Sequence, residues 1–143
     1  MYTGLLHTHS ALRYVVLIGL LIVIITSLLG WMNRKPYTPT DNKLSLILFI
    51  ATHTQLLVGL ILYFGSPFVK FGETTMSDKM TRYWTVEHIF GMLVAIVLIT
   101  LARSTSKRMT DDNAKHKRMF IFNFVALVVI VAIILISDRK LIG

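Results

Sequence analysis

Residues 5–31 read LLHTHSALRYVVLIGLLIVIITSLLGW, an apolar run long enough to cross a bilayer as one α-helix. Three similar runs follow, so that the four occupy about residues 5–31, 44–64, 83–102 and 119–137. The hydrocarbon core of a membrane requires roughly 20 residues per helix, and each run approaches that length. All three prolines fall between the runs, where they interrupt no helix. The sequence therefore predicts an all-α integral membrane four-helix bundle in a single domain.

The first run lacks a basic segment before it and a small-residue cleavage site after it. We therefore expect it to remain as a helix and not to be removed as a signal peptide. Its length also exceeds the apolar stretch of such a peptide.

The charge of the chain follows the same segmentation. Of 143 residues, 55% are hydrophobic, and 15 Lys and Arg against 7 Asp and Glu give a net charge of +8. Nine basic residues flank the first and third connections, and five flank the second connection and the C-terminal tail. The positive-inside rule then predicts that the first and third connections face the cytoplasm and that both termini lie outside. Topology and contact with lipid headgroups account for the charge without a nucleic-acid partner.

Two histidines, His9 and His88, lie about one turn inside the outer ends of the first and third runs. Helices one and three run in the same direction in this topology, so both imidazoles are expected at one depth. An ionisable side chain within a membrane is costly and marks a functional site by default. Two imidazoles at one depth can ligate a single heme iron from both faces. The sequence thus predicts heme b with His9 and His88 as its axial ligands.

The chain has no cysteine. This excludes disulfides, cysteine-ligated iron–sulfur clusters and the covalent attachment of a c-type heme. Any heme is therefore expected to bind noncovalently, through histidine or methionine.

For two residues near the histidines, the sequence offers two interpretations: contact with a cofactor, or an ordinary structural role. Arg13 lies four residues after His9 and shares its helix face, where a heme propionate would give it an anionic partner. Extension to the lipid headgroups, or pairing with Glu87, is an equal alternative. Gly91, three residues after His88, leaves a bare surface for a flat macrocycle, although a glycine there also permits close helix packing.

The second run carries a polar cluster near mid-membrane. Gln55 and Gly59 share one face and are expected to line the cofactor. His53 lies roughly 16 Å from the outer end of its helix, too deep to ligate the same iron. It could contact a cofactor edge or a quinone, or relay a proton, but an interhelical hydrogen bond is the favoured interpretation.

Two other histidines are expected outside the site. His7 points to another face than His9 and should lie near water, although it replaces His9 if the helix register differs. His116 stands in the basic run Lys115–Arg118 and is expected to be a solvated residue on the cytoplasmic side.

Three short motifs resemble one half of heme A synthase, in the same order along the chain. They are HSALR at 9–13, QLLVG at 55–59 and EHIFG at 87–91. The sequence is also similar to short bacterial four-helix membrane cytochromes b. The resemblance implies heme ligation near the outer face by His9 and His88. Leu6 stands where the synthase family has a glutamate, and the chain has half the family's length, so a two-heme synthase would require a dimer.

These observations give three functional hypotheses. The first is a b-type cytochrome of the bacterial inner membrane, which passes electrons between the quinone pool and a partner protein of the respiratory chain. The second is a cofactor-free accessory or structural subunit, with other membrane subunits or a second copy as its partner. The third is a heme A synthase-like or quinone-active enzyme, with Glu87 as its candidate carboxylate. No run is broken by proline, which disfavours a transporter.

Overall fold

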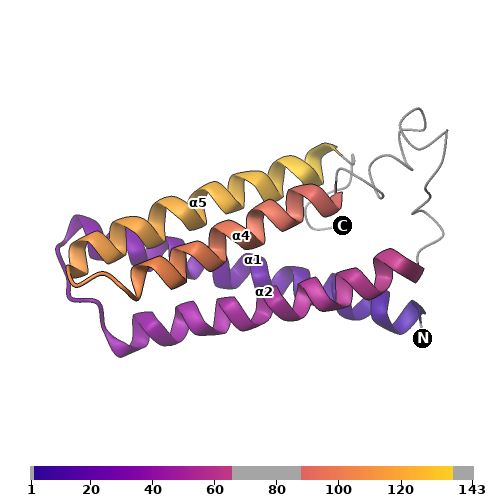
Figure 1. The fold of residues 1–143 in the computed structure, drawn as a ribbon, viewed down its shortest axis with the longest axis horizontal. Helices are drawn as coiled ribbons and strands as arrows, with labels where there is room; N and C mark the ends of the chain where they lie inside the picture. The colour runs from indigo at the N-terminus through magenta and orange to yellow at the C-terminus, as the bar shows by residue number, and fades with distance from the viewer. Residues whose placement is uncertain (1, 66–87, 137–143) are drawn as a thin grey trace.

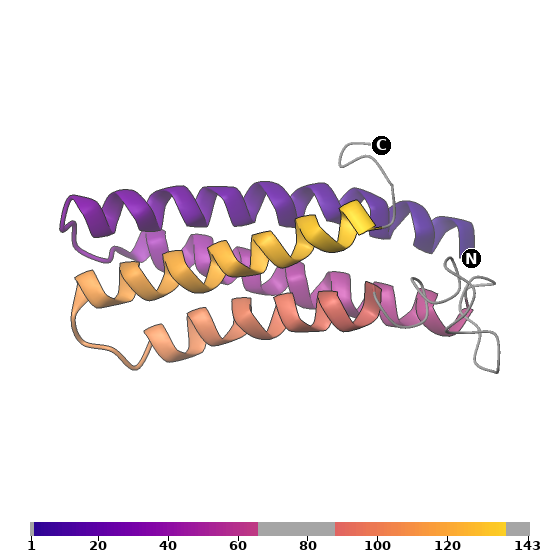
Figure 2. The same cartoon turned by 90° about the horizontal axis from the view of Figure 1, so that it is seen from above.

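The structure is a computed structural model that describes residues 2–65 and 88–136 (Figure 1). This part of the chain forms four α-helices: α1 (Tyr2–Met32), α2 (Pro39–Gly65), α4 (His88–Ser106) and α5 (Asp112–Ile136). Figures 1 and 2 show them along a common long axis, with α1 and α4 running in one direction and α2 and α5 in the other. All four are long and apolar enough to cross a membrane. The predicted multi-pass helical bundle is thereby confirmed.

The helices extend beyond the apolar runs at the end where the two short connections lie. α2 begins five residues before the predicted start, and α5 begins seven residues before it. A reciprocal cap begins α2: the Asp41 N–H donates to Thr38 Oγ1 over 3.2 Å, and the Thr38 N–H donates to Asp41 Oδ2 over 2.9 Å. Capping and backbone hydrogen bonding, not hydrophobicity, decide where a helix begins, so apolar runs give only its membrane-embedded part. The predicted start at residue 83 and end at residue 137 lie outside the described residues.

The packing of the bundle is uneven. α1 contacts both α2 and α5, and α4 lies closely against α5, whereas α2 and α4 form the loosest neighbouring pair. Buried aliphatic side chains from every helix make the core, among them Leu20, Leu48, Ile99 and Ile130. The buried face of α4 is lined by small residues, which let α5 approach closely: Gly91, Ala95, Ala102 and Ser106.

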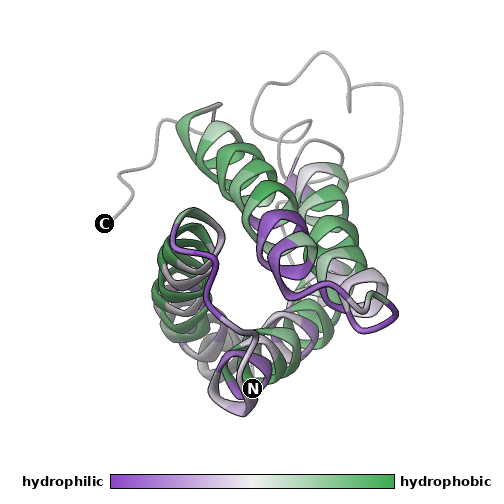
Figure 3. Ribbon diagram, turned by 90° about the vertical axis from the view of Figure 1, so that its left-hand side faces the viewer, coloured by the Kyte–Doolittle hydropathy of each residue, from purple (hydrophilic) through white to green (hydrophobic). Residues whose placement is uncertain are grey.

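The outer surface of the helices is apolar. Large aliphatic side chains are more than half exposed on each helix, such as Ile18, Ile47, Val97 and Val128. Figure 3, which looks at the end with the short connections, shows hydrophilic segments in these connections and the adjoining turns, and mostly hydrophobic helices behind them. Lipid chains, not water, suit such a surface, because it exposes almost no hydrogen-bonding group along the helices.

Candidate functional site

The side chains of His9 and His88 meet at the end of the bundle that holds the N-terminus. Their ring centroids are 6.4 Å apart and their ring planes are inclined at 72°. Both side chains are half-buried. His9 lies near the start of α1 and His88 at the start of α4, and these two helices run in the same direction. The structure thus brings together the two histidines that depth and direction predicted to be neighbours.

α2 fixes the position of His9. Gln55 Nε2 donates a hydrogen bond of 2.8 Å to the backbone carbonyl of His9. A Cβ atom at Gly59 would lie 3.2 Å from His9 Cε1 and 3.7 Å from His9 Nδ1, so the absence of a side chain makes room for the ring. The Nδ1–Cε1 edge of the ring therefore lies against Gly59 of α2. Gln55 and Gly59 therefore both lie against His9, and their role beside a cofactor stays a prediction.

The spacing of the two rings fits a shared metal centre. An imidazole nitrogen lies about 2 Å from a bound metal and about 1.1 Å from its own ring centre, so two imidazoles on opposite sides of one ion have centroids roughly 6.3 Å apart. A direct hydrogen bond between the rings would give roughly 5 Å. The 6.4 Å spacing agrees with the first arrangement and is too long for the second, and it also lies in the range of ordinary edge-to-face ring contacts.

The donor set also limits which metal centre the pair can serve. Two imidazoles fill only two coordination positions, so a fitting cofactor brings further donors of its own, as the four nitrogens of a porphyrin do. Within residues 2–65 and 88–136, no group of three or more His, Cys, Asp or Glu side chains could hold a bare ion. The residues that are present therefore fit a heme better than an isolated metal ion.

Arg13 lies next to the pair, one turn further along α1. Its Nη2 donates a hydrogen bond of 3.0 Å to the hydroxyl of Tyr14, and its guanidinium carbon is 4.8 Å from the centre of that ring. Its alternative partner, Glu87, lies outside the described residues. A propionate as the anionic partner of Arg13 stays a prediction.

Gly91 has a packing role in the structure. A Cβ atom there would collide with the side chain of Ile133 on α5. Gly91 is also buried on the face of α4 that packs against α5. Of the two interpretations offered by the sequence, the structure favours close approach of α4 and α5 over a surface for the macrocycle.

His53 lies deeper in the bundle and has partners on two helices. Its Nδ1 donates to the carbonyl of Phe49 over 2.8 Å, since a carbonyl oxygen can only accept. In that tautomer Nε2 is an acceptor, and the Thr100 hydroxyl on α4 lies 3.5 Å from it. The contact with Thr100 agrees with the favoured interhelical hydrogen bond. His7 is exposed, as expected.

The expectation for His116 is wrong, because this side chain is 2% exposed. Its ring covers Gly30 of α1, lies 5.3 Å from the ring of Tyr37, and places Nε2 3.4 Å from the Pro36 carbonyl. The basic neighbours suggested a solvated position, but α5 extends through them as a helix. One face of α5 carries the buried residues His116, Met119, Asn123 and Ala126. This spacing of three and four residues is the sequence signal that would have found His116.

Comparison with models of known protein families, with curated proteins and with solved structures finds no match. The assignment of the site therefore depends on its residues and their geometry. The strongest element of that geometry is the His9–His88 pair.

Proposed function

We propose that the chain is a membrane b-type cytochrome that holds one heme between α1 and α4, with His9 and His88 as axial ligands. The observation that carries the proposal is the 6.4 Å spacing of two imidazoles from helices that run in the same direction. Chance hydrogen bonding between the two histidines would bring the rings closer than this.

The surroundings of the pair support a flat, partly apolar ligand. α2 and α4 contact each other least among neighbouring helices, and α1 and α5 diverge toward this end of the bundle in Figure 1. A planar group can enter such a region with less loss of helix contacts than at the tightly packed α4–α5 seam. The Gln55 amide holds the backbone of His9 in place, and Gly59 leaves room for its ring against α2.

The proposed activity is electron transfer. His9 and His88 would hold the heme, which would supply one-electron redox chemistry when bound. His9 and His88 would keep oxygen and water off the metal, and Arg13 would offset the negative charge of a propionate. We place the protein in a bacterial inner membrane, where quinones and a second membrane or periplasmic protein are the natural electron partners.

A dithionite-reduced minus oxidised absorbance spectrum of the detergent-purified full chain tests the proposal, together with a pyridine hemochrome assay for stoichiometry. We expect a sharp low-spin b-type spectrum and about one heme per chain. His9→Ala and His88→Ala should each remove that low-spin spectrum. His7→Ala is the matched control, since His7 is an exposed histidine on the same helix.

Two results would contradict the proposal. The first is full heme retention in both single variants, and the second is the absence of bound heme in well-folded wild type supplied with heme. The second result would favour a cofactor-free subunit of a larger membrane complex. Loss of heme in His7→Ala alone would move the ligand from His9 to His7.

A further inference from the structure

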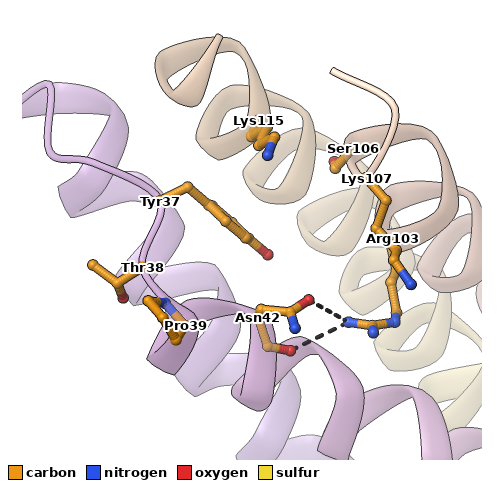
Figure 4. Close-up of a pocket in the computed structure, with 8 residues that line it drawn as sticks. All are labelled: Tyr37, Thr38, Pro39, Asn42, Arg103, Ser106, Lys107 and Lys115. Carbon is orange, nitrogen blue, oxygen red and sulfur yellow. Dashed lines mark hydrogen bonds between the residues drawn. The ribbon is translucent and has the colours of Figure 1, made fainter. Parts of the chain in front are cut away.

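A second candidate site lies at the opposite end of the bundle from the histidine pair, where both short connections meet. It is a pocket of about 310 Å³ between the start of α2, the end of α4 and the start of α5. Figure 4 shows its walls. Its lining combines three cationic and three hydroxyl side chains: Arg103, Lys107, Lys115, Tyr37, Thr38 and Ser106.

The charged side chains that line this pocket are all positive. Three cations line it, and no carboxylate does. Asp41, on the adjoining first turn of α2, is engaged by the backbone N–H and the hydroxyl of Thr38, at 2.9 and 3.0 Å. Around the two short connections, residues 33–43 and 103–118 contain nine Lys and Arg against three Asp. The pocket thus lies in a strongly positive region and selects anions.

The hydroxyl groups add hydrogen-bond donors to this charge. Ser106 is 2% exposed, and its buried Oγ has no hydrogen-bond partner in the structure. Because Ser106 also lines the pocket, this hydroxyl is available to bond a ligand there. Burial raises the pKa of Tyr37 above its usual 10.0, and the nearby Asp41 carboxylate acts in the same direction. The phenol therefore keeps its proton at neutral pH and remains a donor.

Arg103 is held in the wall of the pocket by the beginning of α2. Its Nη1 donates to the Asn42 carbonyl and to Asn42 Oδ1, both over 3.2 Å, and to Ser45 Oγ over 3.1 Å (Figure 4 shows the two bonds to Asn42). A guanidinium has five N–H donors in a fixed plane, so these bonds fix the group without using all its donors. Arg103 is therefore a preorganised cation, while Lys107 and Lys115 can move toward a ligand.

We infer that this pocket binds a phosphate group, carried by an anionic phospholipid or by a soluble phosphate compound. Arginine, lysine and hydroxyl donors are the groups that bind phosphate oxygens with charge-assisted hydrogen bonds. The pocket lies where the membrane-spanning helices end, which is the level of the lipid headgroups. The inference does not depend on the proposed heme, because the two sites lie at opposite ends of the bundle.

The test uses the full chain, delipidated in detergent, and two probes. Native mass spectrometry measures bound dioleoyl phosphatidylglycerol, with phosphatidylcholine for comparison, and phosphorus NMR measures inorganic phosphate. The double variant Lys107→Gln with Lys115→Gln removes two pocket cations from positions outside the core. We expect it to weaken binding of the active probe by about tenfold or more. Ser106→Ala should weaken it by about threefold.

The matched control is Lys43→Gln with Lys117→Gln, which removes the same charge from the same end but outside the pocket. We expect binding within twofold of wild type in this control. Loss confined to phosphatidylglycerol identifies a lipid, and loss confined to inorganic phosphate identifies a soluble ligand. Equal losses in the pocket and control variants, or no binding of either probe to wild type, would overturn the inference.

Discussion

Gly59 decides how closely His9 can lie against α2, because a Cβ atom there would be 3.2 Å from the His9 ring. Gly19 is the matched position on α1, where a Cβ would meet only Leu48 Cδ1 at 3.6 Å. Replacing either glycine by alanine adds up to about 1 kcal/mol of helix propensity, so the difference between the variants reports the contact. We expect Gly59→Ala to retain heme about threefold less well and Gly19→Ala to match wild type, measured as heme per chain. Equal heme contents in Gly59→Ala and Gly19→Ala would argue against His9 as a heme ligand.

Gly30 and His116 form a tighter contact at the other end of α1. A Cβ atom at Gly30 would lie 2.5 Å from His116 Cε1, and the ring is enclosed by Pro36 and Tyr37. We expect Gly30→Ala to destabilise the fold by about 2 kcal/mol, since the ring cannot move aside. Thermal unfolding followed by circular dichroism in detergent measures the change, with Gly19→Ala as control. Adding His116→Ala should cost less than the sum of the single changes, and strict additivity would argue against the contact.

α2 and α4 are linked by polar side chains at two levels, through His53 and Thr100 within the bundle and through Arg103 at its basic end. They form the loosest neighbouring pair, and Arg103 joins the end of α4 to Asn42 and Ser45 at the beginning of α2. We expect Arg103→Ala to destabilise this end by about 2 kcal/mol, because it removes charge-assisted hydrogen bonds. Amide hydrogen exchange should then quicken in the first turns of α2 and stay unchanged in the middle of α5. Arg108→Ala, an exposed position, is the control, and similar exchange in both variants would contradict the prediction.

At the scale of elements, apolar runs predicted the four helices because bilayer thickness sets their length. The meeting of His9 and His88 could also be predicted, since depth along parallel helices is a one-dimensional property. Rotation about the helix axis could not be predicted, and it decides the surroundings of two residues. His116 is buried although its neighbours are basic, and Gly91 serves packing against Ile133. The basic pocket was likewise not predicted, because Arg103 comes from α4, Lys107 from the following connection and Lys115 from α5, and their separate positions indicated only topology.

The whole molecule has two chemically different ends. The histidine pair lies at one end, and the basic pocket at the other. The positive-inside rule predicts that the basic end faces the cytoplasm, and with that orientation the histidine pair lies near the outer face of the membrane. That orientation decides which electron partners reach the proposed heme and which lipid leaflet supplies a phosphate.

Single-cysteine labelling tests this orientation cleanly, because the natural chain contains no cysteine. Gly4 and Asn33 are exposed positions at the two ends of α1, so Gly4→Cys and Asn33→Cys report opposite sides of the membrane. We expect a membrane-impermeant maleimide to label Gly4→Cys in intact cells, and to label Asn33→Cys only after the membrane is permeabilised. The reverse pattern would place the histidine pair on the cytoplasmic side. The nine basic residues around the short connections would then lie outside, against the positive-inside rule, and another interaction would have to set the orientation.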